Sequence, residues 1–172
     1  ITYGVKERHD LKRWILYTNR HLAAKNKDIF LCGISMGCAT TLMAAGLDLP
    51  DNVKGIIADC GFTSPWDIIK HVAKERFHLP PFPLMYMVDL ISEVVAGFGL
   101  KEVSIPEIMK RNKIPVLFIH GDADDYVPMW MTIKNYEACA AKKELYCFRS
   151  RTRTSIFKRY GRGKTKNQKF HR

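Results

Sequence analysis

The segment that most constrains the fold of this chain is residues 28–45, where an apolar run leads into Gly-x-Ser-x-Gly and then into a helix-forming run. The serine of this pattern is Ser35, and the glycines that flank it are Gly33 and Gly37. A strand that passes into a helix through so tight a turn places the serine hydroxyl above the edge of a sheet. We expect both glycines to give room where larger side chains would collide. The segment therefore predicts a strand, a sharp turn and a helix.

The helix that begins beside Ser35 predicts a site that stabilises negative charge. Its first backbone N–H groups and the positive end of its dipole would face any oxyanion formed at the serine. The N–H of Met36 is the predicted donor. The five-residue pattern is about equally compatible with an ordinary Gly/Ser turn. A second signal in the chain favours the catalytic interpretation.

That second signal is a β-branched and aromatic run, residues 114–121, followed by a polar loop. Residues 120–128 read His-Gly-x-x-Asp-x-x-Val-Pro. Here the chain resembles the α/β-hydrolase superfamily, most closely its serine esterases, thioesterases and serine aminopeptidase-like hydrolases. The resemblance implies that Asp124 is the acid that orients a catalytic histidine and stabilises its charged form. Asp59, which ends a predicted strand at 52–59, is the reserve for that role.

The alternation of strands and helices predicts an α/β fold, with a parallel sheet and helices on both faces. The resemblance covers about residues 4–148 and implies a partial α/β-hydrolase fold. An insertion at about residues 62–103 predicts a small helical lid over the serine, with Ser64 as the N-cap of its first helix. Five apolar side chains of this insertion would form an acyl or aromatic pocket, or would be ordinary core contacts: Phe77, Phe82, Met85, Tyr86 and Met87.

The histidine of the triad does not appear where the resemblance implies it. In the superfamily it follows the next strand, typically within Gly-x-Gly-His, but here the predicted strand 143–148 runs into Arg149 and no histidine follows until His171. Codons for residues 149–154 can be chosen so that a shift of one base reads Gly-Ala-Gly-His-Ala. We therefore favour the hypothesis that the tail is out of frame after Phe148.

The charge distribution identifies the same boundary. The chain carries 28 Lys and Arg against 17 Asp and Glu. Residues 149–172 contain ten of these bases and no acid, which leaves 18 bases against 17 acids in residues 1–148. The tail could bind nucleic acid through phosphate contacts and aromatic stacking, or could be a solvated, disordered end. We rank both alternatives below the frame shift, so nucleic acid is an unlikely partner.

The beginning of the chain also predicts a fragment. It starts at Ile1, and its first predicted element is a helix at residues 6–22, the helix just before the nucleophile strand in this fold. We expect the preceding strands, and the loop that donates a second N–H to the oxyanion, to be absent. The most hydrophobic stretch, residues 84–100, is too short for a transmembrane helix and contains Asp89 and Glu93. Five cysteines outside any disulfide-rich pattern favour a reducing, cytoplasmic location.

The resemblance implies a serine hydrolase that acts on an ester, thioester or amide through an acyl-enzyme. The expected substrate is a small acyl compound or a peptide, with no metal and no organic cofactor. Without its histidine, and with Met36 as the one remaining oxyanion donor, we expect this chain to have little or no activity. The alternative is a non-catalytic protein whose basic tail binds nucleic acid or another polyanion.

Overall fold

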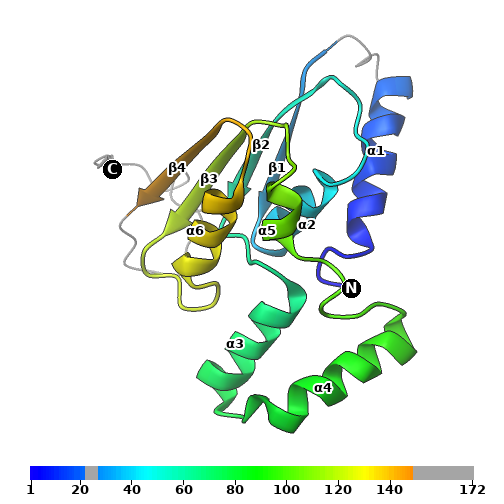
Figure 1. Ribbon diagram of the computed structural model, residues 1–172. Helices are drawn as coiled ribbons and strands as arrows, with labels where there is room; N and C mark the ends of the chain where they lie inside the picture. The colour runs from blue at the N-terminus through cyan, green and yellow to red at the C-terminus, as the bar shows by residue number, and fades with distance from the viewer. Residues whose placement is uncertain (22–26, 149–172) are drawn as a thin grey trace.

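The computed structural model describes residues 1–21 and 27–148, so the predictions for the tail lie outside the described residues. Its centre is a parallel sheet in the order β1-β2-β3-β4 (Figure 1). The strands are β1 (Ile29–Ile34), β2 (Val53–Asp59), β3 (Val116–Gly121) and β4 (Lys143–Phe148). All four lie where apolar runs predicted them, because β-branched and aromatic residues favour a pleated, buried backbone.

One face of the sheet carries the core. Leu31, Ile56 and Val116 are neighbours across the first three strands, and each of these side chains is almost fully buried. Phe118, two residues further along β3 and on the same face, is 1% exposed. Four parallel strands that bury one continuous apolar face need helices against that face.

Those helices form a single layer. They are α1 (Glu7–His21), α2 (Met36–Ala44), α5 (Ile105–Met109) and α6 (Met129–Ala138). α2 contacts β1 and β2, α6 contacts β3 and β4, and α5 packs between α2 and α6, while α1 packs on α2. The fold is therefore the predicted partial α/β-hydrolase fold, with four parallel strands and their connecting helices.

The opposite face of the sheet is more open in the part of the chain that the structure describes. Phe30 is 62% exposed and Ile34 is 40% exposed, and both lie on this face of β1. The Phe30 ring lies over Gly55 of β2, where an added Cβ would be 3.0 Å from a ring carbon. The second helix layer expected from the sequence is not found among residues 1–21 and 27–148.

Residues 64–104 leave the sheet and return to the same point, and we call this segment the excursion. It contains α3 (Pro65–Phe77), α4 (Pro81–Ile91) and a π-helical turn, η1 (Ser92–Ala96). The N–H of Ile105 donates to the carbonyl of Thr63 at 2.9 Å, which closes the base of the excursion. Figure 1 shows α3 and α4 beyond the end of the sheet toward which the arrowheads of β3 and β4 point. A lid role for the excursion stays a prediction.

The first helix of the excursion begins as the sequence predicts. Ser64 has extended backbone angles, and its hydroxyl accepts a hydrogen bond from the N–H of Asp67 at 3.1 Å. Pro65 occupies the first helical position, where no N–H is needed. His78 ends the helix in the left-handed region at φ 52°.

α4 has its polar residue turned inward and most of its apolar residues turned outward. Asp89 Oδ1 accepts a hydrogen bond from the N–H of Leu100 at 2.7 Å, and Met85 is 1% exposed. Lys101 Nζ lies 3.8 Å from the ring centroid of Trp66, so a cation–π contact joins the start of α3 to the chain that follows η1. Seven apolar side chains of α4 and η1 are exposed: Phe82, Tyr86, Met87, Leu90, Ile91, Val94 and Val95.

Within residues 1–21 and 27–148, no helix has both the length and the apolar character required to cross a bilayer. All five cysteines are free. The cytoplasmic location stays a prediction.

We expect Ser64→Ala to lower the free energy of unfolding by about 1 kcal/mol, because the N–H of Asp67 would lose its acceptor. Urea denaturation followed by circular dichroism would measure the change. Ser64→Asn is the matched control, since an Asn side chain can accept the same hydrogen bond and should cost much less. Equal destabilisation by the two variants would contradict a capping role.

Candidate active site

Ser35 lies in a strained turn between β1 and α2. Its backbone angles are φ 52° and ψ −116°, a region that residues with side chains rarely adopt. The N–H of Ser35 donates to the carbonyl of Asp59 at 2.9 Å, and the carbonyl of Ser35 accepts from the N–H of Ala39 at 3.0 Å. The side chain of Ser35 makes no capping bond to α2. The turn is therefore fixed from both sides while the half-buried hydroxyl is left for chemistry.

The two glycines of the pattern have different roles. A Cβ on Gly33 would lie 2.3 Å from the carbonyl oxygen of Gly37 and 2.6 Å from the backbone nitrogen of Cys38. Gly33 is therefore required, because the strand and the first turn of the helix touch through their backbones. A Cβ on Gly37 would have no described atom within 4 Å. The expectation that both glycines relieve a collision is thus wrong for Gly37, which faces outward from α2.

Met36 is the first residue of α2. The N–H groups of the first helical turn have no acceptor within the helix. The Met36 N–H therefore remains available next to Ser35, at the end of α2 where the helix dipole is positive. This arrangement is compatible with an oxyanion site, and Met36 as the donor stays a prediction.

Asp124 lies in the loop between β3 and α6, and the backbone of that loop holds its carboxylate. Its Oδ1 accepts hydrogen bonds from the N–H of Tyr126 at 2.9 Å and from the N–H of Val127 at 3.0 Å. Its own N–H donates to the carbonyl of Gly121 at 3.2 Å. One carboxylate oxygen is thus fixed in place, which sets the direction of the other.

The topology brings the three predicted polar residues to one edge of the sheet. Ser35 follows β1, Asp59 ends β2 and Asp124 follows β3, and all three strands run in the same direction. Two strand spacings separate β1 from β3, which is roughly 10 Å. A group between them, such as an imidazole, is therefore needed to accept the Ser35 proton while Asp124 orients it. Asp59 is fully buried beneath the elbow, and its carbonyl holds the Ser35 N–H.

Cys60 is a residue of this edge that the sequence did not single out. Burial, and then the charge of Asp59, raise the pKa of the Cys60 thiol from 9.0 to about 12. A hydrogen bond with the Ser35 backbone opposes this rise in pKa, and the charge of Asp124 adds to it. The position of Cys60 just after the central strand is the signal that could have identified it. Cys60 stays a neutral thiol and does not compete with Ser35 as a nucleophile.

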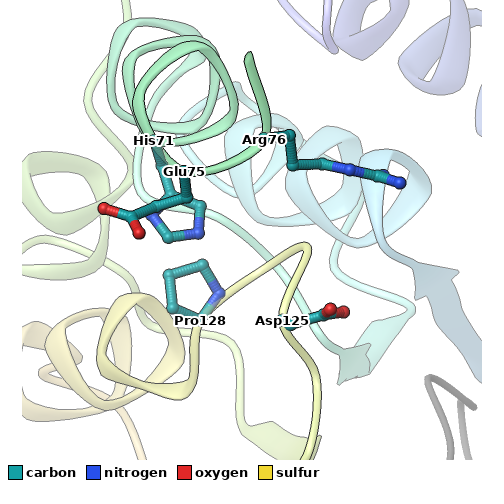
Figure 2. A pocket seen from close by; sticks show the side chains of 5 residues that line it. All are labelled: His71, Glu75, Arg76, Asp125 and Pro128. Carbon is teal, nitrogen blue, oxygen red and sulfur yellow. The ribbon is translucent and has the colours of Figure 1, made fainter. Parts of the chain in front are cut away.

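A cleft of about 500 Å³ lies between α3 and the Asp124 loop. Figure 2 shows His71, Glu75 and Arg76 on the α3 side, with the ring of His71 above Pro128, while Arg76 and Asp125 extend toward the same side. The walls thus combine polar and apolar surface in about equal parts, with four polar or charged side chains among the five that line the cleft. None of the five side chains predicted to form an apolar pocket lines this cleft: Phe77, Phe82, Met85, Tyr86 and Met87. Met85 is in the core and the other four are exposed, Phe77 at the end of α3 and the remaining three on α4.

None of the described histidines lies after β4, where the resemblance implies the base. His9 and His21 lie on α1, His78 ends α3, and His71 of α3 lines the cleft beside the Asp124 loop. His120 is fully buried beneath the Asp124 loop. Residue 171, the histidine of the tail, lies outside the described residues. Within the described part of the chain, no group of three His, Cys, Asp or Glu side chains could hold a metal ion.

We expect Gly33→Ala to destabilise the protein by at least about 3 kcal/mol or to prevent folding, because its Cβ would meet backbone atoms that cannot move aside. Gly37→Ala is the matched control. It should be neutral or stabilising by up to about 1 kcal/mol, since the added methyl group meets open space within a helix. Thermal and urea unfolding of both variants would measure the difference, and similar losses would contradict the described contact.

We also expect iodoacetamide to alkylate Cys32 well before Cys38 and Cys60 in the native protein. Partial burial raises the pKa of the Cys32 thiol, but Cys32 is exposed to the reagent. Cys38 and Cys60 are buried, and burial raises the pKa of the Cys38 thiol well above its usual value and that of the Cys60 thiol to about 12, while the thiolate is the reactive form. Because the Cys60 pKa is about 12, its alkylation rate should still be rising above pH 9. Peptide mass spectrometry would measure the rates, with guanidinium-unfolded protein as the reference in which the three sites become similar.

The comparisons with known proteins agree with this geometry. The sequence model of the prolyl oligopeptidase family matches residues 2–155. The uncharacterized protein YqkD of Bacillus subtilis (strain 168) is 31% identical over 145 residues, which cover 84% of this chain and 47% of YqkD. The chain therefore spans about half the length of this curated relative.

Solved structures show the same fold. The Pyrococcus furiosus esterase Pf2001 aligns with a TM-score of 0.63 at 21% identity, covering 87% of this chain and 55% of the esterase chain. The Pyrococcus horikoshii acylaminoacyl peptidase aligns with a TM-score of 0.61 at 19% identity, covering 86% of this chain and 23% of the peptidase chain. The resemblance to the α/β-hydrolase superfamily is confirmed. Because the sequence model of the prolyl oligopeptidase family matches most of the chain, this protein belongs to that family.

Proposed function

We propose that this protein is a serine hydrolase in which Ser35 attacks the carbonyl carbon of an ester, thioester or amide. The observation that carries the proposal is the turn at Ser35. The backbone of Ser35 is strained, and its hydroxyl makes no capping hydrogen bond to α2, which begins at the next residue. The prolyl oligopeptidase family match supports it, as do the structural likenesses to an esterase and to an acylaminoacyl peptidase.

In the proposed reaction the Ser35 oxygen bonds to the carbonyl carbon while its proton passes to a histidine. The carbonyl oxygen becomes an oxyanion, which the Met36 N–H and the dipole of α2 stabilise. The histidine then gives the proton to the leaving group, and an acyl-enzyme remains. Water attacks the acyl-enzyme by the same route and frees Ser35. Asp124, with one oxygen fixed by backbone N–H groups, directs its other oxygen to the histidine.

The resemblance implies that the histidine of this scheme follows β4, where the sequence has none until His171. Among the described histidines, His71 lines the cleft beside the Asp124 loop. We therefore infer that the 172-residue chain hydrolyses substrates slowly or not at all without an added base. Members of a triad act as a unit, so the loss of one removes most of the rate. In this scheme the imidazole lies beyond the end of β2, between Ser35 and Asp124.

The cleft beside the Asp124 loop supports a substrate with a polar or charged portion. Arg76, His71 and Glu75 face it from α3, and it opens next to the loop that holds the acid. A small acyl compound and a peptide both fit this description. Whether the bond is an ester, thioester or amide depends on contacts at this cleft and on the excursion.

The test is covalent labelling of the 172-residue chain by a fluorophosphonate, with and without added imidazole. We expect an adduct on Ser35 that forms faster with imidazole, is absent in Ser35→Ala, and forms about tenfold or more slowly in Asp124→Asn. Peptide mass spectrometry locates and quantifies the adduct. Ser92→Ala, on η1, is the matched control and should label normally.

A folded chain with no Ser35 adduct, with or without imidazole, would overturn the proposal. His171→Ala is an informative variant in the same assay. If labelling without imidazole disappears in this variant, the tail provides the base. If the rate is unchanged, the tail does not act on Ser35.

The alternative, a basic tail that binds nucleic acid or another polyanion, rests on sequence alone. Residues 149–172 lie outside the described residues, so no contact or distance favours this function. It predicts binding that weakens steeply as salt is added and that disappears when the tail is deleted.

A further inference from the structure

His120 is a fully buried histidine whose two ring nitrogens both have partners. Nε2 lies 2.9 Å from the carbonyl oxygen of Val127, and Nδ1 lies 2.7 Å from the hydroxyl of Thr132. A carbonyl can only accept, so Nε2 must carry the hydrogen. In the neutral ring Nδ1 then accepts the hydroxyl hydrogen of Thr132. Burial lowers the pKa of His120, which favours this neutral form.

Val127 joins this histidine to the candidate acid. Its carbonyl accepts the hydrogen bond from His120, and its N–H donates to Oδ1 of Asp124 at 3.0 Å. Val127 is itself 1% exposed, so neither bond is easily replaced by water. Val127 thus connects the Asp124 carboxylate to the imidazole of His120, which lies in β3.

Thr132 extends the connection to the turn after β2. Its hydroxyl oxygen also lies 3.2 Å from the carbonyl of Gly61, and the Thr132 residue is 1% exposed. The single hydroxyl hydrogen cannot be fully donated to both Nδ1 of His120 and the Gly61 carbonyl, so the Gly61 contact is the weaker of the two. Gly61 packs on α2, where a Cβ added to it would lie 2.4 Å from Sγ of Cys38. One turn further along α6, Asn135 donates to the carbonyl of Phe62 at 3.0 Å. The helix α6, which follows the Asp124 loop, is therefore held against the turn after β2 by the Asn135 hydrogen bond and more weakly by Thr132.

We propose that His120 is a positioning residue for Asp124, holding Val127 so that the carboxylate faces the end of the sheet where Ser35 lies. Thr132 holds the imidazole and fixes its tautomer from the other side. The inference rests on the proposed function, because it concerns Asp124 as the catalytic acid. His120 itself stays buried and does not touch the substrate.

Two substitutions separate a positioning role from a purely structural one. In His120→Gln the amide N–H can take the place of Nε2–H and donate to Val127. In His120→Asn the shorter side chain can reach Thr132 but not Val127. Both variants replace the ring with a smaller amide, so both should lower global stability to a similar extent.

The readout is hydrogen exchange at the backbone N–H groups of Tyr126 and Val127, which bind Asp124, measured by NMR on the 172-residue chain. We expect His120→Asn to accelerate both by about tenfold and His120→Gln by no more than about threefold, as the loss of one buried hydrogen bond predicts. The N–H of Ser35, which donates to Asp59, is the internal reference and should change equally in the two variants. Equal acceleration of the Asp124 loop in both variants would overturn the proposal.

If neither His120 variant folds, Thr132→Ser and Thr132→Val form a second pair, since serine keeps the hydroxyl and valine keeps the shape. The proposal expects faster exchange at Tyr126 and Val127 in Thr132→Val alone. The imidazole ¹⁵N spectrum of the unmodified protein gives a further check, because it should show the neutral tautomer with hydrogen on Nε2. The opposite tautomer would overturn the assignment.

Labelling of Ser35 in the same variants distinguishes this inference from the proposed function. Slower labelling in His120→Asn with near-normal labelling in His120→Gln supports both the positioning role of His120 and the proposed function of Ser35. If the unmodified chain shows no Ser35 adduct, the proposed function fails, yet the exchange rates still decide whether His120 positions the Asp124 loop.

Discussion

The backbone contact between Gly33 and the first turn of α2 is the constraint on which the rest of this structure depends. With no side chain between them, strand and helix approach so closely that the connecting residue is forced into a left-handed conformation. That residue is Ser35, and its N–H reaches across to the neighbouring strand at Asp59. The same contact thus sets the helix against the sheet, raises the serine above the sheet edge and aims the start of α2 at it.

The acid side of the site is held by different means. The Asp124 loop has no close backbone contact of this kind, and its shape is fixed by hydrogen bonds to a carboxylate and to a buried imidazole. Steric exclusion places one half of the candidate site, and buried polar bonds place the other. The two meet where Gly61 packs on Cys38.

The strands and the positions of Ser35 and Asp124 could be predicted from the sequence because both signals are local. An apolar run bounded by turn residues identifies a strand, and the carboxyl ends of parallel strands share one edge. The different roles of Gly33 and Gly37 could not be predicted, since the pattern does not say which glycine faces the strand. Cys60 was missed because its importance comes from its spatial neighbours, and the hydrophobicity of α4 suggested burial that Asp89, turned inward, prevents.

The hydrogen bond between Ile105 and Thr63 has a consequence for how such a protein can change over time. Because the excursion leaves and returns at one point, its length and composition are nearly independent of the spacing between the strands. Inserted or deleted residues there add little strain to the sheet, and loop closure costs rise only slowly with length. The excursion can therefore diverge in length and sequence while Ser35 and Asp124 keep their places at the edge of the sheet.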